Sequence, residues 1–249
     1  MSPQTTTQQY PESMRLPLSG TCVIPAILSV IAGSADVISF LGFGMFTAHI
    51  TGNLVILAAH VVAGQAADLG LILSVPIFIA VLCLMRLLVA GLEAVHIHSL
   101  RPLLMLQLVL LGGAFVCCGA SSQPLNQTAI STVVGSELAV AAMAVQAALV
   151  QLSLKGAPST TVMTTNVTRF VMDVGDVLLG GSPADTVQAR RRAKHTWPVI
   201  LGFTIGAGLG AASFAIVGLK SLGLPVGLAL LVLIVSFTAD PDAERPPQK

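Results

Sequence analysis

The chain has 249 residues, of which 54% are hydrophobic and only 9% are charged, and its formal net charge at pH 7 is +1. Soluble domains carry roughly 25% charged residues, so this composition excludes a soluble globular protein and predicts an integral membrane protein whose partner is the lipid bilayer. So small a net charge gives no basis for a nucleic-acid partner.

The two ends of the chain are polar, whereas its middle is apolar. Residues 1–16 are rich in Thr, Gln and Pro, and residues 241–249 are charged and carry three prolines. Segments of this composition cannot bury enough apolar surface to fold, so both predict disordered tails. Residues 17–240 are expected to form a single membrane domain.

Six stretches of the domain are long and apolar enough to cross a bilayer, for which a helix needs about 20 residues. In chain order they are 18–44, 69–92, 103–119, 130–152, 197–219 and 222–237. Two weaker segments, 47–63 and 161–179, are short or carry charges. The pattern predicts an all-α polytopic membrane protein with six full transmembrane helices and two short broken or re-entrant helices.

The two weak segments resemble each other. Residues 51–55 (TGNLV) align with residues 165–169 (TNVTR), and the helices before them then align Asp36 with Gln146. Each weak segment follows a long helix and precedes a polar linker. We therefore expect an internal repeat with one half at 17–122 and the other at 128–240.

The basic residues predict how these halves are oriented. If both weak segments enter and leave on the same side, Arg101, Lys155 and the basic cluster at 190–194 lie on one face together with both termini. The positive-inside rule makes that face cytoplasmic. The halves then have opposite orientation, which is an arrangement found in transporters. Arg86, near the cytoplasmic end of its helix, is expected to extend its charge towards the interface.

Four short motifs resemble those of a known family. They are residues 33–36 (GSAD), residues 46–54 (FTAHITGNL), Gln146 and residues 162–168 (VMTTNVT). Together they resemble the YoaK-like family of uncharacterised bacterial inner-membrane proteins, over nearly the whole membrane domain. The resemblance implies a multi-pass protein of the bacterial inner membrane and implies no particular activity. The family often has Thr-Gly where residues 165–166 of this chain are Thr-Asn.

The polar residues of the first weak segment allow two interpretations. A bend at membrane depth leaves backbone N–H and C=O groups that need partners. Gly52 permits such a bend, and Thr47, Thr51 and Asn53 can supply the hydrogen bonds. These groups either only hold a broken helix together or line a solute or ion site, and we favour the second because irregular backbone in a membrane usually borders a cavity.

Asp36 is the most informative single residue, because it lies in the middle of an apolar span. A carboxylate there is costly and is a functional candidate by default. It is expected to couple protons or cations, or else to form a fixed pair with Arg169 or a hydrogen bond to Gln146 or the motif threonines. His49 is either a proton shuttle or a hydrogen-bonded structural residue.

The second weak segment adds charged candidates. Arg169 and Asp173 are four residues apart and are therefore able to pair on one helix face, and Arg169 is also able to hold an anionic group. The full predicted solute or ion site comprises Asp36, Thr47, His49, Thr51, Gly52, Asn53, Gln146, Thr164, Thr165, Asn166, Thr168, Arg169 and Asp173.

Gly202, Gly206 and Gly210 recur every four residues and predict close helix packing, either within the fold or in a homodimer. No motif for catalysis, for a cofactor or for a metal is recognisable, so we expect no enzyme. The sequence favours a transporter or channel-like permease for a small polar solute or ion. The alternative is a membrane scaffold or sensor that acts through partners.

Overall fold

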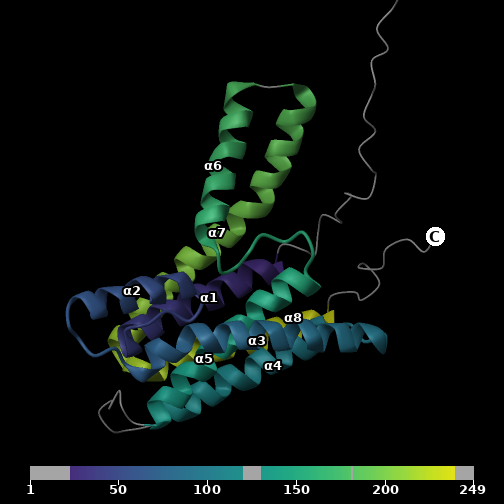
Figure 1. Ribbon diagram of the computed structural model, residues 1–249. Helices are drawn as coiled ribbons and strands as arrows, with labels where there is room; N and C mark the ends of the chain where they lie inside the picture. The colour runs from purple at the N-terminus through teal and green to yellow at the C-terminus, as the bar shows by residue number, and fades with distance from the viewer. Residues whose placement is uncertain (1–22, 120–129, 181, 239–249) are drawn as a thin grey trace, which may run out of the picture.

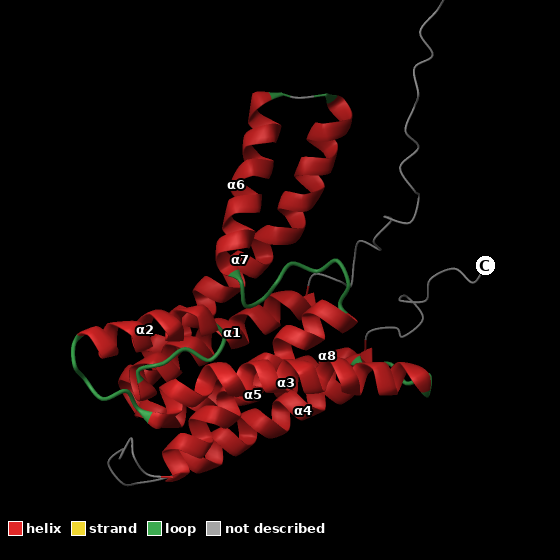
Figure 2. Cartoon of the chain, viewed as in Figure 1, coloured by secondary structure: helices red, strands yellow, loops and turns green. Residues whose placement is uncertain are grey.

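A computed structural model describes residues 23–119, 130–180 and 182–238, and every regular element in these ranges is a helix (Figure 2). The predicted tails lie outside the described residues. The helices are α1 (Val23–Phe43), α2 (Ile50–Val62), α3 (Leu69–Ala94), α4 (Leu100–Ala114), α5 (Ile130–Ser153), α6 (Met163–Leu179), α7 (Pro183–Val217) and α8 (Gly223–Thr238). A π-helical turn, Phe115–Gly119, extends α4, and a 3-10 turn, Gly218–Leu222, joins α7 to α8.

The all-α fold is as predicted, and most helix ends agree with the expected segments. The main difference is α7, which begins at Pro183 rather than near residue 197. Its first turns are polar and therefore fail a test of hydropathy. Ser182 nevertheless caps them, since its side chain accepts a hydrogen bond from the backbone N–H of Asp185 and proline occupies the first turn.

Among the described residues, five stretches are long and apolar enough to cross a membrane. Four of them are α1, α3, α4 with its π-helical turn, and α5, and the fifth, Pro183–Phe237, contains both α7 and α8. Helix α2 is apolar but has only 13 residues. The fold is thus that of a multi-pass membrane protein.

Helices α1 and α5 form the centre of the bundle. In their most apolar windows 67% and 78% of the residues are buried, against 17% for α3. The outward side chains of α3, such as Ile79, Leu84 and Leu87, are exposed. An apolar exterior around a buried pair of helices is what a lipid environment requires, because lipid takes the place of water around the outer helices.

The glycine stripe of α7 packs against α1. A Cβ atom added at Gly206 would lie 2.2 Å from the carbonyl oxygen of Val30, and one at Gly202 would lie 2.7 Å from that of Ala26. Gly33 of α1 is equally close to α7. Of the two expected roles, packing within the fold is the one observed, since Gly202, Gly206 and Gly210 are buried against α1 inside the chain.

The two halves of the chain exchange their helices. Helix α1 packs against α7 and α8, while α5 packs against α3 and α4. Each half thus places its first helix against the last two long helices of the other half. The short helices instead pack within their own half, since α2 contacts α3 and α6 contacts α7.

One part of the second half has no equivalent placement in the first. Helix α2 lies along the bundle, whereas α6 and the first turns of α7 form a hairpin that stands away from it (Figure 1). Buried Ala189 and Ala193 of α7 face α6, and an ion pair between Asp173 and Arg192 joins the two helices. The hairpin is therefore held together by its own contacts.

Candidate functional site

Asp36 is hydrogen-bonded to the loop that leads from α1 to α2. One of its carboxylate oxygens, Oδ1, accepts hydrogen bonds from the backbone N–H groups of Thr47 at 2.9 Å and Ala48 at 2.6 Å. The hydroxyl of Thr47 donates to the same oxygen at 3.2 Å. Asp36 is only 2% exposed. Its carboxylate supplies the acceptor that these buried backbone N–H groups of the loop would otherwise lack.

The other carboxylate oxygen of Asp36, Oδ2, pairs with Nδ1 of His49. A carboxylate can only accept, so Nδ1 carries a proton and Nε2 is left for other partners. This hydrogen bond raises the pKa of His49 above its ordinary value of 6.5; burial of the ring opposes the shift, and the charge of Asp36 adds to it. Asp36 thus pairs with His49 and Thr47. The expected pairing with Arg169 or Gln146 is wrong, because both oxygens are taken by the loop that follows α1.

Asn53 closes the same loop from the first turn of α2. Its Oδ1 accepts from the backbone N–H of Phe46 and its Nδ2 donates to the carbonyl of Phe46, both at 2.7 Å. Nδ2 also donates to the hydroxyl of Ser74 at 3.0 Å. Gly52 fits beneath the ring of Phe46, since a Cβ there would lie 2.8 Å from it. Asn53 and Gly52 were predicted from the sequence as site residues. Ser74 was not, because it is a single serine within an apolar run.

The weak segments predicted at 47–63 and 161–179 are called the interrupted segments below. In the second of them an asparagine makes a similar but simpler set of hydrogen bonds to the loop before it. Nδ2 of Asn166 donates to the carbonyl of Ser159 at 2.6 Å, and Ser159 precedes Asn166 by the same seven residues that separate Phe46 from Asn53. Each asparagine thus bonds to the carbonyl seven residues before it. Pairing these two asparagines would shift the alignment made from the threonines, Thr51 against Thr165, by one residue.

Gln146, which the sequence comparison aligned with Asp36, is buried in α5. Its Nε2 donates to the hydroxyl of Thr160 at 3.0 Å and to the carbonyl of Leu28 at 2.8 Å. Gln107 of α4 donates to its Oε1 at 2.7 Å. Thr160 stands seven residues before Val167, as Thr47 does before Leu54, so a polar side chain in each central helix holds a threonine in the loop that follows it. Neither Gln107 nor Thr160 was predicted.

A cavity of about 530 Å³ lies where the two interrupted segments begin. Its walls come from the start of α2, one face each of α3 and α5, and the loop and first turn leading into α6. The lining residues are Ala48, His49, Ile50, Thr51, Phe78, Leu82, Arg86, Ala147, Ala148, Gln151, Leu152, Ser159, Thr161, Val162, Met163 and Thr164. Its size lies within the range of about 300 to 1,000 Å³ that is usual for small-molecule sites.

The predicted site residues fall into three groups around this cavity. His49, Thr51 and Thr164 line it. Asp36, Thr47, Gly52, Asn53, Gln146 and Asn166 lie behind its walls and shape them. Thr165, Thr168, Arg169 and Asp173 are not among its lining residues.

Arg169 and Asp173 do not form the predicted pair. The carboxylate of Asp173 is buried and accepts from Nε of Arg192 at 2.7 Å, while Arg169 is exposed on the outside of α6. Residues four apart on a helix share a face only roughly, and here Asp173 turns towards α7. Arg86 of α3, interpreted from the sequence as an interfacial charge, is instead the arginine that reaches the cavity.

The family of the chain follows from a match that covers the domain just described. The family defined as "protein of unknown function (DUF1275)" matches residues 24–235, which span α1 to α8. The chain belongs to this family. The YoaK-like proteins are part of it, so the resemblance drawn from the motifs is confirmed. No curated protein and no solved structure matches the chain.

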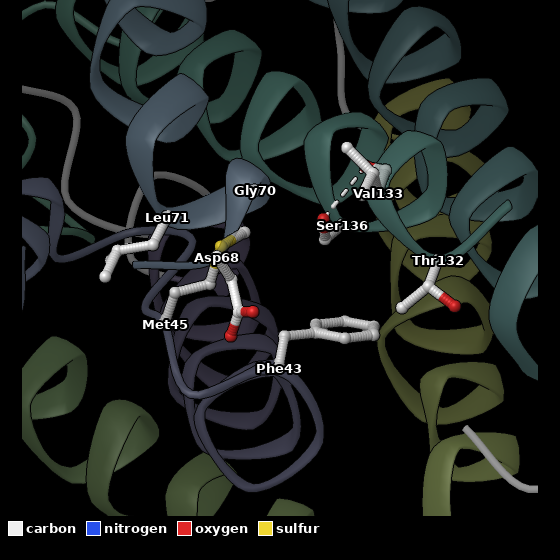
Figure 3. Close-up of a pocket in the computed structure, with 8 residues that line it drawn as sticks. All are labelled: Phe43, Met45, Asp68, Gly70, Leu71, Thr132, Val133 and Ser136. Atoms are coloured by element: carbon white, nitrogen blue, oxygen red, sulfur yellow. Dashed lines mark hydrogen bonds between the residues drawn. The ribbon is translucent and has the colours of Figure 1, made fainter. Parts of the chain in front are cut away.

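Both halves of the family's domain also border a second, much smaller hollow (Figure 3). It measures about 10 Å³ and lies between Phe43, Asp68 and Ser136, with Leu71 and Thr132 at its edges. A volume of this size has room for about one water molecule. The larger cavity is therefore the candidate site for a solute.

Proposed function

We propose that this member of the DUF1275 family is a permease for a small polar solute or ion, and that the solute binds in the cavity between the two interrupted segments. The observation that carries the proposal is the lining of this cavity. Residues from the start of α2 and from the start of α6 face each other across it, although they are more than 100 residues apart in the chain. Broken helices that meet around a cavity are the usual construction of a transporter binding site.

We further infer that the halves form an inverted repeat, with α1, α3, α4, α5, α7 and α8 crossing the membrane, α2 re-entering it, and α6 bound to the first turns of α7 outside it. The exchange of helices between halves and the matching hydrogen bonds of Asn53 and Asn166 support this inference. The length of α2 supports its part, because at 1.5 Å per residue its 13 residues span about 20 Å, short of the roughly 30 Å of a hydrocarbon core.

The pair of Asp36 and His49 is the proposed site of proton coupling. Nδ1 of His49 is committed to Asp36, while the ring lines the cavity and leaves Nε2 to gain or lose a proton there. Asp36 also holds Thr47 and Ala48 of the loop. A change in the protonation of His49 thereby acts on the backbone that forms one wall of the site.

The proposed orientation follows the positive-inside rule. The first turn of α4 with Arg101, the loop with Lys155 and the 190–194 cluster in the first turns of α7 then face the cytoplasm, together with both termini, in a bacterial inner membrane. The cavity lies between this face and the loop that follows α1.

Transport by purified protein in proteoliposomes tests the proposal. A solid-supported-membrane current or a fluorescent pH change, with an imposed solute gradient, reports uptake. We expect Asp36→Asn to abolish the pH dependence of uptake and the exposed Asp176→Asn, which leaves the cavity intact, to preserve it. Wild-type vesicles that move no ion, acid or neutral solute above the rate of empty vesicles would contradict the permease.

A second candidate function is a membrane scaffold or sensor. The hairpin of α6 and α7 favours it, because the hairpin stands away from the bundle and exposes Val171 and Met172. A scaffold needs this hairpin and no open cavity. Filling the cavity by Thr51→Trp would therefore abolish the action of a permease and leave that of a scaffold unchanged.

A further inference from the structure

We propose that the cavity is selective for an anion, namely a small organic molecule that carries a carboxylate or another oxyanion group. This inference rests on the proposed permease and names the class of its substrate. Three features of the cavity carry it: the charge of its walls, the helix ends that open into it, and its size.

The charge of the walls comes from Arg86 of α3. None of the residues that line the cavity is an aspartate or glutamate, and Arg86 is the one among them with a permanent charge. Within the described part of the chain no carboxylate forms an ion pair with Arg86, since the ion pairs found there join Asp36 to His49 and Asp173 to Arg192. A cation would meet this guanidinium without compensation, whereas an oxyanion would receive charge-assisted hydrogen bonds from it.

The carboxylate nearest to the cavity does not offset this charge. Asp36 stands behind His49, and both of its oxygens are occupied by the loop of Thr47, Ala48 and His49. It is almost wholly buried and does not line the cavity. Arg86 is therefore left to interact with whatever enters.

Two helices begin at the walls of the cavity, and the first turn of neither helix is capped by a side chain. His49 stands at the start of α2 and Val162 at the start of α6, and neither makes a side-chain capping bond. The first backbone N–H groups of a helix have no partner within the helix, and the helix dipole makes this end partly positive. The N–H of Gly52 already donates to the carbonyl of His49. The other first N–H groups of both helices, with the hydroxyls of Thr51 and Thr164 beside them, thus add hydrogen-bond donors to the charge of Arg86.

The size of the cavity indicates an organic anion. About 530 Å³ exceeds what a halide needs and suits a molecule with several carbon atoms. Phe78, Leu82 and Leu152 supply an apolar wall for that carbon skeleton.

His49 links the anion to the proton. Its Nε2 accepts hydrogen bonds when the ring is neutral and donates when it is protonated, so a protonated His49 offers the anion a second positive donor. The charged groups that face it are Asp36 from α1 and Arg86 from α3, while α5 and α6 contribute neutral Gln151 and Thr164. Anion and proton are therefore expected to enter together.

Binding to the purified protein tests the inference independently of transport. The probes are sodium lactate, sodium succinate and inorganic phosphate, with choline chloride and glycerol as cationic and neutral controls at matched ionic strength. We expect at least one oxyanion to raise the thermal unfolding temperature in detergent and neither control to do so, because a ligand that binds only the folded state stabilises it. Lactate, succinate and phosphate also tell a carboxylate site from a phosphate site.

Variants of Arg86 locate the binding. Arg86→Gln is expected to weaken binding of the oxyanion by about 10-fold or more, while Arg86→Lys retains most of it. Arg191→Gln makes the same change at an exposed arginine of α7 outside the cavity and is expected to bind as the wild type does. Equal affinity for the wild type and Arg86→Gln, or binding of none of the three oxyanions, would overturn the inference.

Uptake by proteoliposomes separates this inference from the proposed function. Movement of choline or glycerol without any oxyanion would refute the anion and keep the permease. Binding of an oxyanion that is never carried across would refute the permease and keep the anion site.

Discussion

Replacing Asn53 with alanine removes a buried side chain that holds the loop before α2. Asn53 makes two hydrogen bonds to the backbone of Phe46 and one to the hydroxyl of Ser74. Each such bond contributes about 1 kcal/mol, and a buried backbone group left without a partner costs about 1 to 3 kcal/mol. Since Phe46 is only half-buried, we expect the free energy of unfolding to fall by about 2 to 4 kcal/mol.

Asn166→Ala is the matched control, because Asn166 also bonds to the carbonyl seven residues before it. Asn166 makes one hydrogen bond of ordinary strength, to Ser159, besides a long contact at 3.9 Å to the sulfur of Met163. We therefore expect a loss of about 1 kcal/mol.

The assay is equilibrium unfolding in mixed micelles of dodecyl maltoside and SDS, followed by the fluorescence of the single tryptophan, Trp197. The expected order of stability is wild type, then Asn166→Ala, then Asn53→Ala. A loss at Asn166 equal to that at Asn53, or no loss at Asn53, would show that these hydrogen bonds do not hold the interrupted segments as described.

Two further predictions concern the packing and the titration of the site. Gly206→Ala would place a Cβ atom 2.2 Å from the carbonyl oxygen of Val30 and should lower the free energy of unfolding by about 1 to 3 kcal/mol in the same assay. Gly208 has open space around it, so Gly208→Ala should leave the stability unchanged or raise it slightly. Equal effects of the two variants would contradict the close contact. Asp36→Asn removes the charge and the charged acceptor that raise the pKa of His49, so the NMR titration midpoint of its imidazole should move down. In the wild type His49 stays protonated to a higher pH, and an unchanged midpoint in the variant would show that Asp36 does not set it.

The sequence predicted the fold class well, because the property that defines it is hydropathy. Apolar runs of sufficient length indicate helices, and the starts of α3 and α5 were placed correctly. The start of α7 was missed because a test of hydropathy detects only apolar helices, and the first turns of α7 are polar. Its signal was nevertheless present, since Ser182, Pro183 and Asp185 form a start sequence for a helix.

The candidate site was predicted in its first half and less well in its second. Asp36, His49 and Asn53 are close in sequence, so their contacts follow from one loop. Arg86 and Gln151 reach the cavity only because α3 packs against α5, and a lone arginine in an apolar run gives no sign of this. Arg169 illustrates the reverse error, because it lies next to the motif in sequence but on the outer face of α6.

The register of the two halves also required the structure. The threonines of each segment allow more than one alignment, since the second segment has threonines at 160, 161, 164, 165 and 168. The hydrogen bonds of Asn53 and Asn166 instead favour an alignment of these two residues. A polar motif rich in one residue type thus leaves the register of a proposed repeat open.

The proposed permease requires the chain segments that lead into α2 and α6 to enter the membrane from opposite sides and meet at the cavity. Single cysteines in a cysteine-free background, labelled with a membrane-impermeant maleimide in right-side-out and inverted vesicles, test this directly. We expect cysteines at Leu41 and Gln65, on either side of α2, to react from the periplasmic side, and cysteines at Lys155 and Ser182, on either side of α6, to react from the cytoplasmic side. Labelling of either pair from two different sides would mean that the segment between them crosses the membrane, and the inverted arrangement around the cavity would then be wrong.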